Sequence, residues 1–461
     1  ISTMSRQLIS KYISMEKRTE QLLKDPIFPL LIRMSAPNTV AFLINAFVVL
    51  AEFWFIGQLG LVPLAAITLA FPAIMLTQQM AFGALGGAVS SSISRSLGAN
   101  NINRAEKLLW HSLYISSFGA LAFFLVFIFF GKWLLVTLGG SGALLEESLK
   151  YCLVYLSGGL VVWFSGSLTA ALRGMGDMQF PAKLTVICAG IQIFLSSGFI
   201  LGWFGFPKLG LVGSAWSMII TSSFMAVACV MKLISTKSPV KLKIQKITFE
   251  KNLFKDIFSV ALPASLSPIF TVGTVLVLTG LIGQFGTSAI AGYGIGSRVE
   301  FLLIPIVFSI GTAMTTMVGT NIGADNIDRA ERIGVVGASS AGLLSGVIGL
   351  ILALTPDIWI SIFTEDQETL MVTKQYIQIL GVCYLFQGLG LSLYFASQGA
   401  NAMKWPIIIT ALRFFVFTIA ALISVYWLST GLVGIFYSSA GAMILFGILM
   451  VVALKKGAWR K

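Results

Sequence analysis

Two copies of one nine-residue stretch decide the fold of this chain: Gly98-Ala99-Asn100-Asn101-Ile102-Asn103-Arg104-Ala105-Glu106 and Gly323-Ala324-Asp325-Asn326-Ile327-Asp328-Arg329-Ala330-Glu331. Seven of the nine positions are identical, and the copies lie 225 residues apart in a chain of 461. Each copy follows a long apolar segment. A polar loop that is repeated at half-chain distance in a very apolar chain predicts two homologous membrane halves.

The repeat extends well beyond this loop. Four further pairs match at spacings of 221 to 226 residues: Ala36-Pro37 with Leu262-Pro263, Gly57-Gln58-Leu59-Gly60 with Gly283-Gln284-Phe285-Gly286, Arg173-Gly174 and Pro181 with Gln398-Gly399 and Pro406, and Gly210-Leu211-Val212-Gly213 with Gly431-Leu432-Val433-Gly434. Each half holds six apolar segments, which is an even number. The two halves are therefore expected to share one orientation, related by an axis along the membrane normal.

The composition is that of an integral membrane protein. The chain is 57% hydrophobic and 11% charged, whereas soluble domains carry about 25% charged residues. The apolar segments have the length of about 20 residues that a membrane-spanning helix needs, and they lack the alternation of a membrane barrel. We expect an all-α membrane protein with twelve spans, at about 30–55, 63–92, 107–131, 150–172, 182–203, 211–232, 256–283, 289–318, 332–354, 371–397, 405–428 and 432–454.

The basic residues predict the orientation of these spans, because lysine and arginine collect on the cytoplasmic side of membrane proteins. With the N-terminus inside, 26 of the 31 basic residues fall on that side. Both termini are then cytoplasmic, in a multi-pass protein of the cell membrane that we expect to be a prokaryotic inner membrane. The net charge of +13 is spread over short loops, so we expect no nucleic-acid partner.

The same patterns predict the domain organisation. Residues 1–25 are charged and amphipathic and are expected to lie on the inner membrane surface. Residues 26–231 form the first lobe and residues 256–461 the second. A basic cytoplasmic linker, residues 232–255, joins them.

Few ionisable residues lie within the predicted spans, where a charge is costly and commonly faces a cavity. Glu52 in the first span is the clearest candidate for a functional role; the alternative is a boundary residue that faces lipid headgroups. Gln192 and Ser196 are four residues apart and so share one helix face. The pair is a candidate for the same functional site as Glu52, and the alternative is a polar contact with a neighbouring helix.

The second half offers weaker candidates. Arg298 and Glu300 lie in the eighth span, where they are two residues apart and point to different sides of the helix. Each is a candidate for substrate binding or ion coupling, with a structural polar contact as the alternative. The four cysteines show no metal-ligand spacing, and the sequence has no catalytic cluster and no phosphate-binding loop with its lysine. We therefore expect neither an enzyme nor an ATP-driven pump, with no cofactor and no resident metal.

These motifs together resemble the multidrug and toxic compound extrusion (MATE) family over nearly everything from residue 26 onward. The segments that carry the resemblance are Glu52 with Gly57-Gln58-Leu59-Gly60 and Leu64-Ala65-Ala66, the two repeated loops, Leu172-Arg173-Gly174-Met175-Gly176-Asp177 with Pro181, and Ala291-Gly292-Tyr293-Gly294-Ile295-Gly296-Ser297-Arg298-Val299-Glu300. The resemblance implies twelve helices in two six-helix lobes that form a V around a central cleft. It also implies export driven by inward flow of Na⁺ or H⁺.

The resemblance assigns an ion-coupling role to Glu52, where the family has an essential aspartate. Many relatives carry an Asn-x-x-x-Asp pair in the fifth span, and the matching positions here hold Gln192 and Ser196. Another branch uses acids in the seventh and tenth spans, at positions that here hold Thr271 and Gln387. Glu52 is thus the one matched coupling carboxylate.

The resemblance therefore implies a secondary active exporter that exchanges a cation for lipophilic, cationic drugs or toxins by alternating access. We expect it to act in the bilayer as a functional monomer. We favour H⁺ over Na⁺, because Glu52, Gln192 and Ser196 offer few oxygens and one charge to a hard cation. One alternative is a flippase for lipid-linked precursors from the same superfamily, which would need a more basic cleft. A membrane enzyme or scaffold is the alternative from another class.

Overall fold

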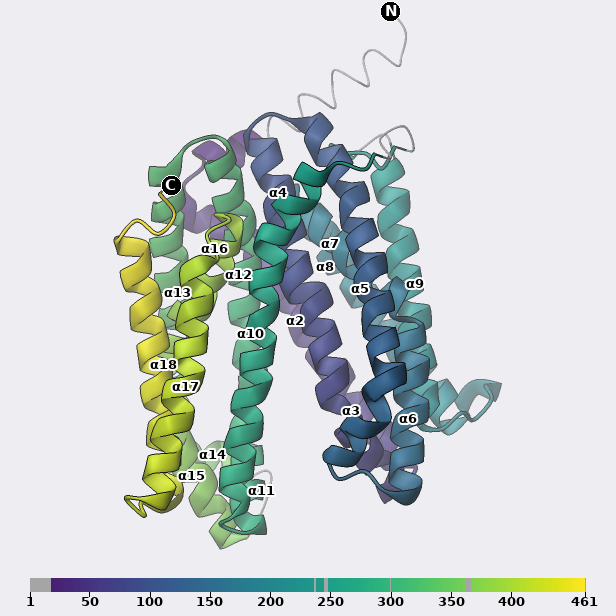
Figure 1. Ribbon diagram of the computed structural model, residues 1–461, viewed down its shortest axis with the longest axis vertical. Helices are drawn as coiled ribbons and strands as arrows, with labels where there is room; N and C mark the ends of the chain where they lie inside the picture. The colour runs from purple at the N-terminus through teal and green to yellow at the C-terminus, as the bar shows by residue number, and fades with distance from the viewer. Residues whose placement is uncertain (1–17, 236–237, 244–247, 299, 362–365, 461) are drawn as a thin grey trace, which may run out of the picture. The chain divides into compact units, whose positions relative to one another are not determined.

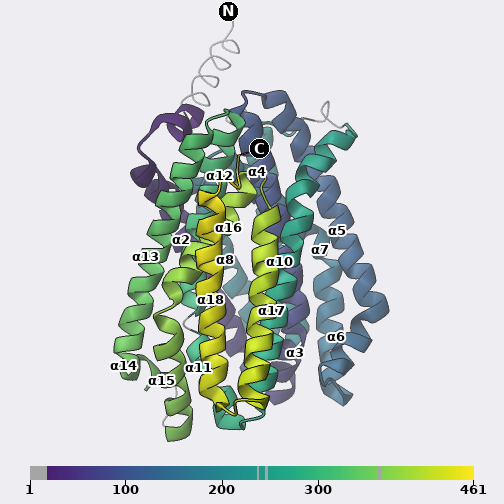
Figure 2. The ribbon, with the colours of Figure 1, turned by 60° about the vertical axis from the view of Figure 1, so that its left-hand side comes forward.

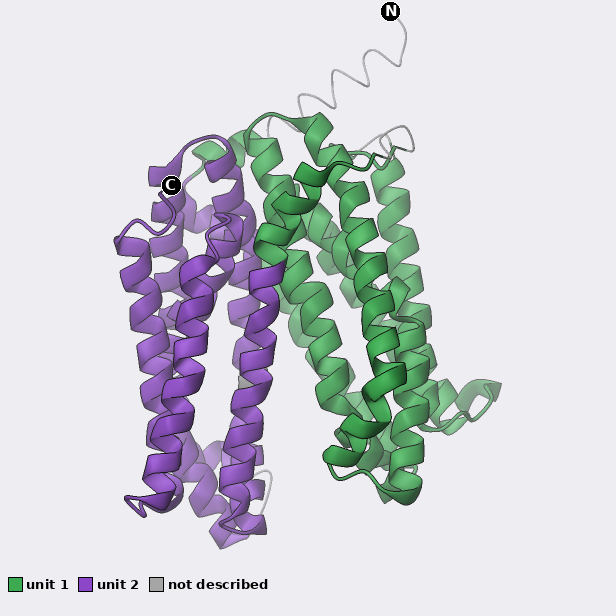
Figure 3. Cartoon of the chain, in the orientation of Figure 1, with its two compact units in different colours: residues 1–25, 36–261 green, residues 26–35, 262–461 purple. Residues whose placement is uncertain are grey.

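The computed structural model describes residues 18–235, 238–243, 248–298, 300–361 and 366–460. Every regular element in these ranges is a helix (Figure 1). Most of the predicted amphipathic segment, residues 1–17, lies outside the described residues. The chain divides into two compact units, residues 1–25 with 36–261 and residues 26–35 with 262–461 (Figure 3). The predicted lobe and linker boundaries stay a prediction.

The helices of each half follow the repeat. The first half contains α2 (Ile27–Gly57), α3 (Leu61–Gln78), the π-helix η1 (Gln79–Leu85), α4 (Gly86–Gly98), α5 (Ile102–Thr137), α6 (Gly142–Ser157), α7 (Gly159–Gly174), α8 (Gln179–Leu201), the 3₁₀ turn η2 (Trp203–Gly205) and α9 (Leu211–Ile234). The second half contains α10 (Lys251–Gly283), α11 (Thr287–Ser297), α12 (Glu300–Gly323), α13 (Ile327–Leu354), α14 (Pro356–Ile360), α15 (Gln367–Gly381), α16 (Tyr384–Gly399), α17 (Lys404–Tyr426) and α18 (Gly431–Lys455).

Among the described residues, ten helices are long and apolar enough to cross a membrane, and twelve spans result if each of two bent pairs counts as one. The bent pairs are α6 with α7, at 50°, and α15 with α16, at 57°. The expected all-α membrane fold is confirmed. The predicted fourth and tenth spans are bent because their helices break at matched positions, Gly158 and Cys383.

The predicted eighth span, 289–318, covers two described helices, α11 and α12. The helix α11 ends at Ser297, and Arg298 is its C-cap. A side chain at Gly292 or Gly296 would collide with α15, so these glycines serve close helix packing.

The repeated loop has the same local structure in both halves. Asn100 and Asp325 adopt left-handed backbone conformations, with φ of 55° and 58°, which asparagine and aspartate tolerate better than most residues. The next residues, Asn101 and Asn326, cap α5 and α13 with their side-chain oxygens, which accept backbone N–H groups at 2.9 and 3.4 Å. The shared sequence therefore encodes a tight turn followed by a helix start.

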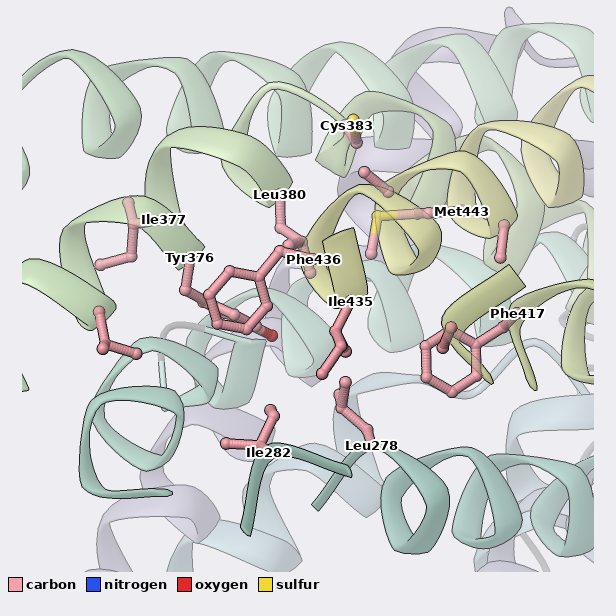
Figure 4. Close-up of a cluster of buried hydrophobic side chains, with 14 of the residues drawn as sticks. Leu278, Ile282, Tyr376, Ile377, Leu380, Cys383, Phe417, Ile435, Phe436 and Met443 are labelled. Carbon is pink, nitrogen blue, oxygen red and sulfur yellow. The ribbon is translucent and has the colours of Figure 1, made fainter. Parts of the chain in front are cut away.

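Each half also has its own buried apolar cluster at matched positions. In the first half, Ile56, Tyr151 and Ala215 belong to this cluster. The second-half cluster includes Ile282, Tyr376 and Phe436 (Figure 4). Its residues include side chains from α10, α15, α17 and α18. The helix α18 packs on both α15 and α17, and Figure 2 shows α17 beside α18. These clusters hold the helices on which the candidate residues lie.

Candidate functional site

Glu52 on α2 faces two polar residues of α8. The Gln192 amide donates to Glu52 Oε1 at 2.6 Å, and the Ser196 hydroxyl donates to the same oxygen at 2.5 Å. Gln192 is 5% exposed and Ser196 is fully buried. The spacing of four residues places both on one face of α8, and the structure brings this face to the carboxylate. Glu52 therefore lies at a hydrogen-bonded contact between α2 and α8.

Two further residues complete this cluster, and the sequence analysis did not select either. Ser214 on α9 lies within hydrogen-bonding reach of the Glu52 carboxylate, and it also reaches the hydroxyl of Tyr151 on α6. Tyr155, one turn beyond Tyr151, accepts the side-chain amide of Gln78 at 2.9 Å. The spacing of Tyr151 and Tyr155 places both on one face of α6, which is a signal that the sequence did contain.

Close packing of α9 on α8 brings Ser214 to the site. The preceding residue, Gly213, lies against the backbone of α8 at Phe199, and a Cβ atom placed there would lie 2.6 Å from the Phe199 carbonyl oxygen. A glycine at this position is therefore a steric requirement of the site. This steric requirement explains the second glycine of Gly210-Leu211-Val212-Gly213, the first-half copy of the Gly-Leu-Val-Gly repeat.

We expect Gly213→Ala to lower stability by about 1–3 kcal/mol, the usual cost of overpacking a tight contact. The measurement is the thermal unfolding midpoint of the detergent-purified protein. Gly190→Ala on α8 is the matched control, because no atom lies within 4 Å of a Cβ built there. A Gly213→Ala protein as stable as the Gly190→Ala protein would contradict this account of the contact.

The cluster can carry a proton, and it has the oxygens for a weak cation site. It contains one carboxylate with hydroxyls from serine and tyrosine. Gln192 Oε1 is buried without a hydrogen-bond partner, although buried polar atoms are nearly always paired. Among the residues that the structure describes, no group of three or more His, Cys, Asp and Glu could hold a metal ion.

Three of the second-half candidates, Thr271, Gln387 and Arg298, have described side chains. Thr271 is exposed on α10 and donates to the Ser267 carbonyl of its own helix at 2.9 Å. Gln387 on α16 is half-buried, and Arg298 is exposed. The side chain of Glu300 lies outside the described residues. In the part of the chain that the structure describes, no hydrogen bond or ion pair joins Arg298, Thr271 and Gln387.

The repeat spacing shows what replaces the site in the second half. Positions 226, 225, 225 and 221 residues after Glu52, Gln192, Ser196 and Ser214 hold Leu278, Phe417, Ala421 and Ile435. All four belong to the buried apolar cluster of the second half, and three of them are labelled in Figure 4. The carboxylate site of one half has an apolar counterpart in the other, so the two halves have diverged at this position.

A helical membrane protein built from a sequence repeat, with a carboxylate hydrogen-bonded between its helices, has the features of a multi-pass membrane transporter. The comparisons with known proteins give the family. The chain belongs to the MatE family, whose model matches residues 37–197 and again residues 263–423. The two matches are offset by the repeat spacing, which confirms the duplication. As a MatE protein the chain is a transporter and not an enzyme.

Several relatives match over most of their length. A probable multidrug resistance protein NorM from Thermotoga maritima is 25% identical over 433 residues, which cover 94% of this chain and 93% of the relative. An FAD transporter from Shewanella oneidensis is 26% identical and covers 84% of each chain. The multidrug export protein MepA from Staphylococcus aureus is 25% identical over 82% of this chain and 84% of its own.

Solved structures show the same fold. A MOP superfamily transporter from Pyrococcus furiosus superimposes with a TM-score of 0.88 at 22% identity, covering 96% of this chain and 98% of the other. A MATE structure in a bent conformation gives a TM-score of 0.86 at 23% identity, with 95% and 99% covered.

Proposed function

We propose that this protein exports lipophilic, cationic drugs or toxins in exchange for protons, and that Glu52 carries the proton. The observation that supports the coupling role is the Glu52 carboxylate held by Gln192 and Ser196 at 2.6 and 2.5 Å. The names of the relatives from T. maritima and S. aureus support drug export. The relatives described above are drug and FAD transporters, which favours small-molecule export over the flipping of lipid-linked precursors.

Gln192 gives the site a way to respond to the proton. With Glu52 ionised, the amide donates its N–H to the carboxylate and Oε1 has no partner. When Glu52 is protonated, the carboxyl O–H becomes a donor. A rotation of the Gln192 amide then lets Oε1 accept that O–H, so both protonation states are hydrogen-bonded. Proton binding thereby changes the contact between α2 and α8, and such a local change can bias two conformations of a transporter.

The driving force is large enough for export. Exchange of one proton for one monovalent cation moves no net charge across the membrane, so the pH gradient supplies the driving force. Each pH unit contributes about 1.4 kcal/mol, which supports a substrate gradient of about tenfold.

Several features favour a proton over Na⁺. Hard cations select sites by the number and charge of their oxygen ligands, and this cluster supplies one carboxylate. The other groups are neutral hydroxyls and one amide oxygen.

We further propose that both termini are cytoplasmic, because of the distribution of basic residues, and that the protein functions as a monomer. We also propose a role in substrate binding for the second-half candidates Arg298, Glu300, Thr271 and Gln387. The structure describes no contact between them.

The proposal is tested with purified protein in liposomes. Efflux of a lipophilic cation such as ethidium is recorded under an imposed pH gradient at zero Na⁺, and separately under a Na⁺ gradient at fixed pH. We expect transport to follow the pH gradient. Transport by a Na⁺ gradient alone, with no response to the pH gradient, would overturn the proton assignment. Absence of ethidium transport together with transport of FAD would overturn the substrate class.

A further inference from the structure

The repeated nine-residue segment ends in a glutamate, Glu106 or Glu331, and this glutamate binds a basic side chain in both halves. Glu106 lies about one turn into α5, and Glu331 lies about one turn into α13. The Lys243 ammonium lies 2.9 Å from Glu106, and the Arg460 guanidinium binds Glu331 through two nitrogens, at 2.9 and 2.6 Å. Lys243 follows α9 and Arg460 follows α18, so each base comes from the segment after the last helix of its own half.

In the first half, the segment after α9 is anchored beyond this ion pair. The indole N–H of Trp110 on α5 donates to the Lys243 carbonyl at 2.8 Å. Ser238 and Val240 are fully buried, and the Ser238 hydroxyl donates to the Val240 carbonyl at 2.6 Å. Glu106 itself is 4% exposed. A buried carboxylate requires a partner, so the lysine contact is more than a solvated surface pair.

The far end of the same segment also binds α5. The Glu250 backbone N–H donates to Nε2 of His111 at 3.0 Å, and the Lys107 ammonium lies 2.5 Å from the Glu250 carboxylate. The Lys107 hydrogen bond holds the pKa of Glu250 below its ordinary value. His111 is the one histidine of the chain and is fully buried. It therefore serves as a hydrogen-bond acceptor for this segment.

The second half repeats this arrangement with different residues. Trp459 is 4% exposed, and its indole N–H donates to the Ser397 hydroxyl on α16 at 3.1 Å. Its ring covers Gly334 on α13, where a Cβ would collide with it. Arg460 also binds Asp328 of the loop at 2.8 Å. The Glu331 carboxylate raises the pKa of Arg460 above its ordinary value.

The main helix contacts do not provide this connection. The helix α9 packs chiefly on α6, α7 and α8, and α18 packs chiefly on α15, α16 and α17. Neither last helix has α5 or α13 among its main neighbours. The segments after α9 and α18 therefore connect the last helix of each half to the start of its third span.

We propose that the duplicated loop is a docking site for the basic segment that follows the last helix of its own half. The glutamate at the end of each loop receives the lysine or arginine, and an indole and buried side chains next to it hold the segment in place. Each docked segment thereby connects the last helix of its half to the loop and to the helix that follows the loop. This role accounts for a sequence repeat that the Glu52 site does not use.

The test measures the exposure of a cysteine at the buried contact that each docked segment makes. The four native cysteines are buried, so the background of labelling by a membrane-impermeant maleimide is low. Val240→Cys reports on the first half and Ser397→Cys on the second, in full-length protein in detergent. Lys404→Cys is the exposed reference. We expect both reporters to react at least about tenfold more slowly than the reference, because labelling then requires local opening.

Charge reversal then tests the two ion pairs. Glu106→Lys should speed labelling of Val240→Cys about tenfold, and Arg460→Glu should do the same for Ser397→Cys. The exchanged pairs, Glu106→Lys with Lys243→Glu and Glu331→Arg with Arg460→Glu, should restore protection. Glu106→Gln and Arg460→Gln are milder variants in case reversal prevents folding, which size-exclusion elution reports. Unchanged labelling after reversal or neutralisation in either half, or no recovery in the exchanged pairs, would overturn the proposal.

Discussion

Glu52→Gln is expected to abolish proton-driven accumulation while the protein still folds. Glutamine has nearly the same shape, and its carbonyl oxygen can accept the Ser196 hydroxyl that now binds the carboxylate at 2.5 Å. It cannot take up and release a proton. Since each pH unit supplies about 1.4 kcal/mol, or tenfold in substrate gradient, the variant should lose about a factor of ten per unit of imposed pH difference.

The measurement is the final ratio of ethidium across the liposome membrane at several imposed pH gradients. The wild-type ratio should rise with the gradient, and the Glu52→Gln ratio should stay flat. Glu52→Asp is the matched control, because it keeps a carboxylate on a side chain shorter by one methylene, and it should retain part of the slope. A Glu52→Gln protein with the wild-type slope would remove Glu52 from the coupling mechanism.

Ser196→Asp is expected to change the ion that the site prefers. The Ser196 oxygen lies 2.5 Å from Glu52 Oε1, so an aspartate there places a second carboxylate beside the first. Two carboxylates at this distance cannot both ionise unless a cation lies between them. Added charge and oxygens favour a hard cation, and we expect at least about a tenfold drop in the half-saturating Na⁺ concentration, which is about 1.4 kcal/mol.

The measurement is efflux at fixed pH over a series of Na⁺ concentrations, in liposomes that contain the wild type, Ser196→Asp or Ser196→Asn. The asparagine variant has the shape of aspartate without its charge, so it separates ligand charge from packing. Na⁺ stimulation should appear in Ser196→Asp and not in Ser196→Asn. If folded Ser196→Asp protein shows no response to Na⁺, the ligand set around Glu52 is not the coupling site.

The sequence by itself determined the spans and the repeat. A helix in lipid must satisfy its own backbone hydrogen bonds, so the length and hydropathy of a segment decide locally whether it crosses the membrane. The loop from Gly98 to Glu106 returns because the same turn and helix cap are needed twice, with left-handed φ at Asn100 and Asp325. The i, i+4 spacing of Gln192 and Ser196 likewise places two polar groups on one helix face, because the helical period alone sets which residues share a face.

The tertiary structure decided which residues meet that face. Ser214 and Tyr151 reach the site because α9 approaches α8 at Gly213, and such an approach depends on the rotation and packing of whole helices. The same holds for Lys243 and Arg460, which bind glutamates far away in the sequence. Local pattern sets what a segment can form, whereas contacts between distant segments depend on three-dimensional packing that no single stretch of sequence encodes.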